Sequence, residues 1–154
     1  MKIDVHTHIL PERWIDFREK FGDDRFPHVD HYAPCCARIL IEGEGRREIR
    51  ENCWSPRRRI EECDATGVTL QVLSTLPVMF SYWAKPEHAA DLARFLNDHL
   101  AGVVTDHPKR FTALGALPMQ DAGLAVKELE RCVKQLHFPG VQIGTNVAGK
   151  NLDA

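Results

Sequence analysis

The sequence lacks the marks of a nucleic-acid-binding, membrane-spanning or secreted protein. Its formal net charge is −2, which offers nucleic acid no basic surface to bind. The longest uncharged run, residues 65–84, contains Pro77 and several polar side chains, so we expect no membrane span. Asp4 and two histidines occupy the N-terminal stretch where a signal peptide needs an unbroken apolar core. These absences predict a cytosolic protein.

The sequence also lacks a cysteine pattern that would indicate a disulfide framework or a zinc ribbon. The chain has five cysteines, an odd number, and none of them forms a Cys-x-x-Cys pair. Cys63 and Cys132 fall within helical patterns and are predicted to lie in the core. The adjacent Cys35 and Cys36 are a weak signal for metal or redox chemistry, and ordinary reduced thiols are the simpler explanation.

What the sequence does have is the composition of one globular α/β domain. Hydrophobic residues make up 44% of the chain and charged residues 27%, and 154 residues can bury a core. Apolar runs predict four short strands, at residues 3–5, 68–73, 111–116 and 140–143. Periodicity and capping residues predict helices between them, at about 56–66, at about 86–107 and after Asp121. This alternation is typical of parallel βα units.

One long segment, residues 9–54, interrupts the alternation after the first strand. Within it, residues 38–42 and 47–50 flank the glycine-containing turn at residues 43–45. We therefore predict a small inserted hairpin at about residues 30–54. If the strands belong to a barrel, this insertion lies beside the site, because the loops that follow barrel strands form the catalytic face.

Two histidines at the end of the first strand predict a metal site. Side chains two residues apart on a strand point to the same face, so His6 and His8 should project together, with Asp4 on the same side. A catalytic zinc takes three protein ligands and a water, of which this pair could supply two. Asp4 could fix the tautomer of one histidine or be a solvated carboxylate. Two histidines that only meet solvent are the plainer alternative.

Several longer stretches resemble one particular family. The opening DVHTHILP is similar to the first-strand signature of the amidohydrolase superfamily. PVMFSYWAKP, FPGVQIGT and RENCWSPRRRIEECDATGVTLQVLST resemble the 2-amino-3-carboxymuconate-6-semialdehyde decarboxylase family within it, and the resemblance runs from Met1 to about Thr145. It implies an α/β fold that is the N-terminal half of a TIM (β/α)8 barrel of the metal-dependent amidohydrolase type, with residues 1–154 as a single truncated domain.

The same resemblance implies a function. Members of the family are carboxy-lyases, which carry out a Zn²⁺-dependent, non-oxidative decarboxylation of 2-amino-3-carboxymuconate 6-semialdehyde in tryptophan and kynurenine catabolism. This reaction limits the synthesis of quinolinate and NAD. By resemblance, His6 and His8 are zinc ligands, Arg47 binds a carboxylate of the small dicarboxylic substrate, and the full-length form is a homodimer. No partner of nucleic acid or membrane type is implied.

Not every candidate has one interpretation. Arg47 lies among alternating arginines and glutamates, so a solvated hairpin face would also explain it; its planar, permanently charged guanidinium nevertheless suits a carboxylate. The side chains that follow the second predicted strand could line a substrate cleft or pack in the core, the latter being the simpler role: Met79, Phe80, Tyr82 and Trp83.

The resemblance also implies what this chain does not contain. The family's remaining zinc ligands, a histidine and an aspartate, and its proton-transfer histidine belong to later strands, so no catalytic residue is assigned here. We expect the 154-residue chain to be weakly active or inactive. Two alternatives stay open. The chain could be a non-catalytic form that associates with full-length subunits, or it could belong to another metal-dependent decarboxylase or hydrolase of the superfamily.

Overall fold

A four-stranded parallel sheet forms the centre of the protein in a computed structural model that describes residues 1–42 and 45–153. Its strands run in the order β1–β5–β6–β7, which places β1 and β7 at the two edges. The bounds are Ile3–His8, Leu70–Ser74, Phe111–Gly115 and Gly140–Val141. The predicted parallel arrangement is therefore confirmed. The fourth strand is shorter than predicted, although the Gln142 N–H still donates to the Gly115 carbonyl at 2.8 Å.

Three helices follow the sheet strands where capping residues predict them. In α2 (Pro56–Thr66), the Ser55 hydroxyl accepts the Arg58 N–H, and Gly67 ends the helix with a φ of 72°. In α4 (Ala122–Lys134), the Asp121 carboxylate accepts the Leu124 N–H. The long α3 (Pro86–Asp106) begins at a proline. Proline at the first position and glycine just past the end are typical helix boundaries, so local chemistry fixes these bounds.

The insertion after β1 is larger than the predicted hairpin. It contains α1 (Phe17–Phe21) and a three-stranded antiparallel sheet of β2 (His28–Ala33), β3 (Cys36–Ile41) and β4 (Gly45–Arg50), in that order. Strands β3 and β4 pair at the predicted place, and residues 43 and 44 of the predicted turn lie outside the described residues. Strand β2 was not predicted because its alternation is hidden by polar residues, with only Val29 fully buried.

Short elements complete the chain. The single-turn helices η1 (Glu51–Cys53) and η2 (Pro77–Phe80) follow β4 and β5, and β8 (Asn146–Val147) pairs with β9 (Lys150–Asn151) after β7. None of the helices in the described ranges is long and apolar enough to cross a membrane.

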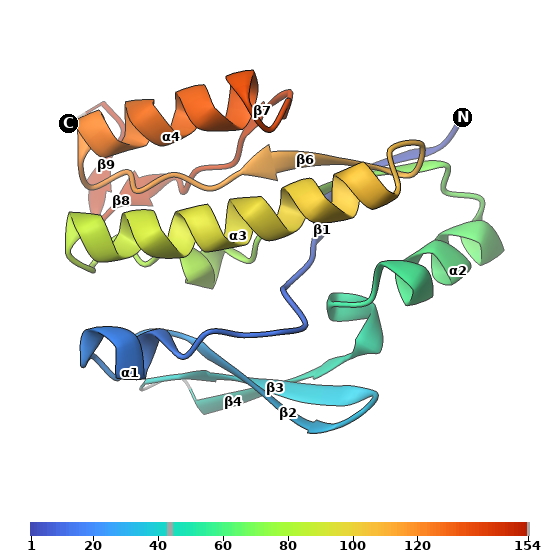
Figure 1. Cartoon of the computed structure of the whole chain (residues 1–154), viewed down its shortest axis with the longest axis horizontal. Coiled ribbons are helices and arrows are strands. Elements are labelled where there is room, and N and C mark those ends of the chain that lie inside the picture. Colours follow the sequence, from blue (N-terminus) through green and yellow to red (C-terminus); the bar gives the residue numbers. More distant parts are fainter. Residues whose placement is uncertain (43–44, 154) are drawn as a thin grey trace.

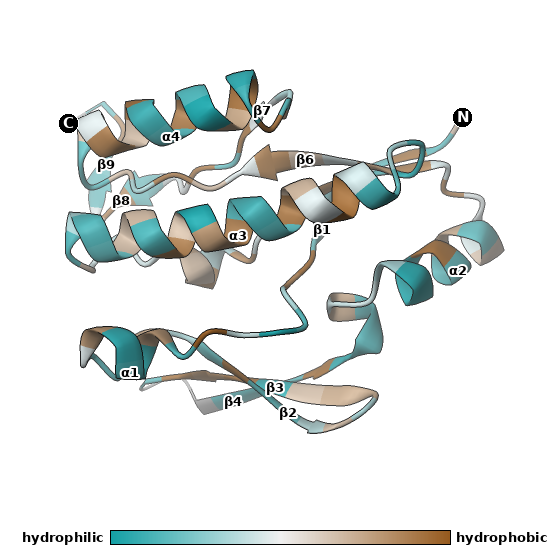
Figure 2. Ribbon diagram, in the orientation of Figure 1, coloured by the Kyte–Doolittle hydropathy of each residue, from teal (hydrophilic) through white to brown (hydrophobic). Residues whose placement is uncertain are grey.

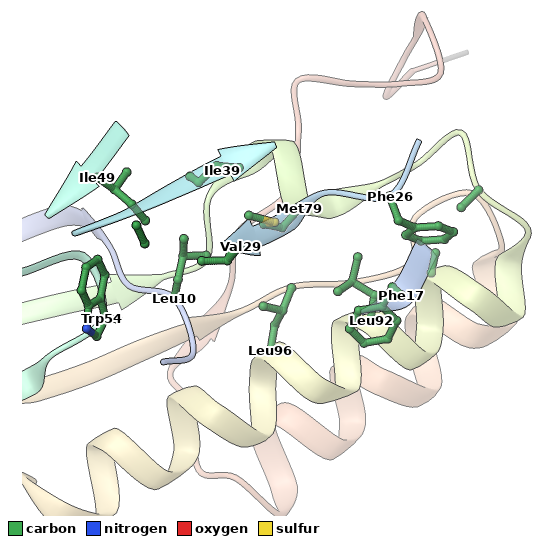
Figure 3. Packing of buried hydrophobic residues seen from close by; sticks show 13 residues of the cluster. Leu10, Phe17, Phe26, Val29, Ile39, Ile49, Trp54, Met79, Leu92 and Leu96 are labelled. Carbon is green, nitrogen blue, oxygen red and sulfur yellow. The ribbon is translucent and has the colours of Figure 1, made fainter. Parts of the chain in front are cut away.

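Helix α3 runs between strand β6 and the antiparallel sheet in Figure 1, and its side chains take part in two clusters of buried residues. Its Leu92 and Leu96 pack with side chains of the antiparallel sheet, as Figure 3 shows. Its Leu100 and Val103 pack with the parallel sheet, and the helix surface divides into polar and apolar stripes (Figure 2). The predicted core cysteines of α2 and α4 are both buried.

The segment that follows His8 joins these two clusters. Ile9 belongs to the cluster under the parallel sheet and Leu10 to the cluster under the antiparallel sheet, and each side chain is only 1% exposed. The Ile9 N–H donates to Ser74 on β5 at 3.0 Å, and the Leu10 N–H donates to Cys53 in η1 at 2.8 Å. The C-terminal end of β1 is therefore anchored in both halves of the molecule.

Candidate metal centre

The two histidines lie together at the C-terminal end of β1. Their ring centroids are 4.9 Å apart and the rings meet edge to face, with an interplanar angle of 80°. They occupy the same edge of the parallel sheet as the loops that follow β5 and β7. In parallel α/β folds this is the edge where ligands bind. The prediction that the two imidazoles project together agrees with this geometry.

His8 is held in one tautomer by Ser74, a residue that the sequence did not single out. The His8 Nδ1 lies 3.0 Å from the Ser74 Oγ, and the Ser74 hydroxyl donates to the Thr7 carbonyl at 3.3 Å. A serine hydroxyl has one proton, so when it donates that proton to Thr7 its oxygen can accept the N–H of a His8 ring protonated at Nδ1. The lone pair of Nε2 is then available for a metal. The position of Ser74 at the end of the neighbouring strand was the available signal.

The environment of His8 favours its neutral form. Burial is the main reason that the pKa of His8 lies below its usual value of 6.5, and the nearby His6 and Arg59 lower it further. Backbone groups of Thr75 and Ser74 act in the opposite direction without reversing the shift. A neutral imidazole is the form that binds a metal ion.

Asp4 does not share the face of the histidines, which corrects the sequence prediction. The register of β1 against β5 is irregular between Asp4 and Thr7, so the simple alternation fails before His6. The Asp4 Oδ2 instead accepts the side-chain amide of Gln71 at 3.0 Å. Its Oδ1 accepts only the backbone N–H of His6, at 3.4 Å. Ser74, not Asp4, contacts an imidazole.

Arg59 of α2 contacts the same C-terminal end of β1 through its guanidinium. Its guanidinium donates to the Thr7 hydroxyl, to the His8 carbonyl at 2.6 Å and to the Asn52 carbonyl at 2.7 Å. The side chain is buried, and burial lowers its pKa from the usual range.

Arg47 lies on the inserted sheet, away from these contacts. It pairs across the hairpin with Ile39 and lies two residues from Ile49, and both of these are buried. Because side chains alternate along a strand, Arg47 points to the face of the hairpin that packs on the core. It is nevertheless exposed, and it forms no ion pair within the described residues. The structure does not bring Arg47 into contact with the histidines.

A cleft of about 540 Å³ opens between the insertion and the loops after β5 and β7. Three of the four candidate cleft residues line it, while Met79 is 1% exposed and packs in the core. Ile41 also lines the cleft, and it lies diagonally across the β3–β4 hairpin from Arg47. Arg25, Ile41, Phe80, Tyr82 and Trp83 are among its lining side chains.

Two imidazoles fit a divalent metal as part of a ligand set. Neutral nitrogen donors at the end of a strand, one with its other nitrogen bonded to a hydroxyl, are what a zinc ion takes. In residues 1–42 and 45–153, no group of three or more histidine, cysteine, aspartate or glutamate side chains is placed to hold a metal. The described part of the chain thus offers two candidate ligands for such a centre.

The chain belongs to the amidohydrolase family, whose model matches residues 3–154. It is 54% identical over 153 residues to the 2-amino-3-carboxymuconate-6-semialdehyde decarboxylase of Dictyostelium discoideum, an alignment that covers 99% of this chain and 43% of that protein. It is 38% identical to the enzyme of the same name from Caenorhabditis elegans, with the same coverage of 99% and 43%. The resemblance noted in the sequence is therefore confirmed, and the chain spans less than half the length of these relatives.

A solved structure gives the same result for the fold. The dihydroxybenzoic acid decarboxylase of Polaromonas sp. JS666, solved with manganese and the inhibitor 2-nitroresorcinol, superposes with a TM-score of 0.60 and 29% identity. The match covers 91% of this chain and 37% of that one. Together with the family match, it confirms the predicted fold class, the N-terminal half of an amidohydrolase-type (β/α)8 barrel.

Proposed function

We propose that this chain is part of a metal-dependent carboxy-lyase that decarboxylates 2-amino-3-carboxymuconate 6-semialdehyde in the cytosolic catabolism of tryptophan. The observation that carries the proposal is the pair of converging imidazoles at the end of β1, in a chain 54% identical to a decarboxylase of that name. The reaction is non-oxidative, so it needs no electron acceptor. The metal would be Zn²⁺, because neutral imidazole nitrogens are common zinc ligands.

His6 and His8 would hold the ion through one ring nitrogen each. In His8 that nitrogen is Nε2, since Nδ1 is engaged by Ser74. A bound divalent cation supplies Lewis acidity to a substrate oxygen or to a water. The protein's own contribution is to hold the two ring centroids 4.9 Å apart and to lower the pKa of His8, mainly by burial.

The substrate would lie between the metal pair and the inserted sheet. Arg47 offers a fixed positive charge and a planar fork that can take a carboxylate by two hydrogen bonds. The neighbouring cleft adds the apolar faces of Phe80, Tyr82 and Trp83, which suit a flat conjugated chain. Arg25 lies 4.3 Å from the Trp83 ring and adds a second positive charge at the rim.

A combined metal and turnover assay tests the proposal. The chain is purified, supplied with Zn²⁺ or separately with Mn²⁺, and freed of excess ion; bound metal and loss of the semialdehyde absorbance are then measured. Metal bound through His6 and His8 and any turnover above the metal-free protein support the proposal. The His6→Ala/His8→Ala double variant should lose both, while the exposed control His31→Gln should lose neither.

Dihydroxybenzoate is the informative competing substrate, because a structural neighbour is a dihydroxybenzoic acid decarboxylase. Turnover of dihydroxybenzoate in preference to the semialdehyde would support the proposed carboxy-lyase activity but contradict the proposed substrate. Failure to bind either metal would reject the metal role of the two histidines. Since the relatives are longer than this chain, a protein that contains these residues together with the remaining family ligands should show the higher turnover.

A further inference from the structure

Arg59 is a buried arginine without an acidic partner. Its side chain is only 9% exposed, and it forms no ion pair with a carboxylate in the part of the chain that the structure describes. Burying a charge without a direct ion pair is costly, and although the carboxylates of Glu62 and Asp4 favour the charged form of Arg59, burial is the larger effect on its pKa. Its Nε finds no hydrogen-bond acceptor within the described residues either.

The two guanidinium nitrogens that do bond join four separate segments. One donates to the hydroxyl of Thr7 and, at 3.5 Å, to the side-chain oxygen of Gln71 on β5. The other donates to the carbonyls of His8 and of Asn52 in η1, at 2.6 and 2.7 Å. The side chain thus connects α2 with β1, with β5 and with the end of the inserted sheet. Two of its four acceptors belong to Thr7, which lies between the two proposed metal ligands, and to His8, which is one of them.

This part of β1 needs an external support. The register of β1 against β5 is irregular between Asp4 and Thr7, so the regular ladder does not fix the backbone that carries His6. Strand β1 also lies at the edge of the sheet. The Arg59 guanidinium bonds Thr7 and His8, which the ladder also pairs with Leu73 and Ser74, so it adds a second constraint on the residues that follow His6, and its planar fork fixes direction as well as distance.

We propose that Arg59 is a positioning residue of the metal centre, whose guanidinium holds the Thr7–His8 backbone so that the two imidazoles keep their converging arrangement. The inference rests on the metal role of His6 and His8 proposed above. Arg59 itself touches neither the metal nor the substrate. It acts through the strand, in the manner of residues that orient metal ligands, where loss costs about 10–100-fold in metal affinity.

The neighbouring arginine provides a matched control. Arg58 lies one residue earlier in the same helix, is half exposed, and pairs only with Glu61 and Glu62 of its own helix. Arg58→Met therefore makes the same change of side chain in the same helical turn without affecting a contact with β1. Arg59→Met removes all four hydrogen bonds but keeps an apolar stem of similar length in the buried site.

The test follows the ring resonances of His6 and His8 by NMR in the chain without metal and during a titration with Zn²⁺. In the wild-type chain and in Arg58→Met, cross-relaxation between the two rings should be present, and the zinc dissociation constants should agree within about two-fold. Arg59→Met should lose the inter-ring contact and bind Zn²⁺ about 10–100-fold more weakly. Arg59→Lys, which keeps the charge but not the fork, should be weakened to an intermediate extent.

Three results separate the possible failures. If Arg59→Met is folded and keeps both the ring contact and the wild-type zinc affinity, the positioning role is wrong. If Arg59→Met does not fold, the test uses Arg59→Lys. Wild-type zinc affinity in Arg59→Lys would contradict the proposal. A loss of zinc affinity with an unchanged urea midpoint would support it. If the wild-type chain shows the ring contact but binds no zinc, the metal role fails, while the effect of Arg59 on ring geometry is still measured.

Discussion

The end of β1 and the β3–β4 hairpin carry the two halves of the candidate site, and they are built in opposite ways. Of the two candidate metal histidines, His8 precedes two fully buried residues, contacts Ser74 through its ring and accepts a hydrogen bond from Arg59 at its carbonyl, whereas His6 is exposed. Arg47 is exposed on an antiparallel strand and forms no ion pair within the described chain. His8 is therefore fixed before any ligand binds, whereas Arg47 can adjust.

This difference follows from what each half has to recognise. A metal ion at about 2.0–2.1 Å from an imidazole nitrogen tolerates little error in the position of its ligands. A guanidinium acts on a carboxylate through charge and a two-pronged fork at the end of a flexible chain, so it can adapt to the ligand. Rigid support is needed at the imidazoles, and exposure is tolerable at the arginine.

The largest effect is expected from removing a metal ligand. His8→Ala should weaken the binding of Zn²⁺ by more than about 100-fold, because the outer residues around a metal ligand already account for 10–100-fold. His6→Ala should behave similarly. The measurement is zinc competition against a chromogenic chelator. His31→Gln serves as the control, since its ring meets Trp54 and not the metal pair. Equal zinc affinity in all variants would contradict the fixed metal site.

A smaller effect, on the free energy of unfolding, is expected from removing a buried side chain that packs against the parallel sheet. The Asn97 side chain is fully buried and makes four hydrogen bonds. Two are with the backbone of Ala116 at 2.8 and 2.9 Å, one is with Glu128 at 2.7 Å and one is with the Cys132 sulfur at 3.3 Å. Asn97→Ala leaves these partners unpaired, so it should lower the free energy of unfolding by about 3 kcal/mol. Arg94→Ala, exposed on the same helix, should change it by under about 0.5 kcal/mol. Urea denaturation distinguishes them, and equal midpoints would contradict the assignment.

A comparable change is expected with pH at His99 of α3. Burial lowers the pKa of His99 to about 4, partly offset by the backbone of Leu10. The unfolded chain takes up this proton near pH 6.5, whereas the folded chain does not until about pH 4. Stability is thus fully present above pH 6.5 and is lost, up to about 3 kcal/mol, as the pH falls through that window. The free energy of unfolding measured from pH 7.5 to 4 checks this.

The variant His99→Gln provides the comparison for that pH profile. It removes the titrating group, so its stability should fall less steeply below pH 6.5 than that of the wild-type chain. A remaining slope is expected because the pKa values of His8 and His28 are also lowered, mainly by burial. Parallel profiles for the variant and the wild type would show that His99 is not the source of the pH dependence of stability.

The smallest change in stability is expected at Arg47. Arg47→Gln should alter the free energy of unfolding by under about 0.5 kcal/mol and leave zinc affinity unchanged, because the side chain is exposed and lies apart from the histidines. Its effect should be confined to the substrate, as a raised KM in any preparation that turns over the semialdehyde. A marked loss of zinc binding in this variant would contradict the expectation that Arg47 and the two histidines act independently.

Much of the fold follows from local sequence signals. The bounds of α2, α3 and α4 agree with prediction because Ser55, Asp121 and the helix-starting prolines act on their own neighbours. The parallel order of the strands follows from helices long enough to cross between them. Strand β2 escaped prediction because only its pairing with β3 explains the segment, and a pairing partner is not a local property.

For the site, the sequence by itself determined the candidate ligands: two imidazoles two residues apart at a strand end, and a resemblance that singles out Arg47. Only the tertiary structure decided which groups support them. The irregular register of β1 turned Asp4 to the other face, and residues distant in sequence, Ser74 and Arg59, took over the contacts. The physical reason is that a buried hydrogen bond depends on what the fold brings within about 3 Å, and spacing along the chain does not report that distance.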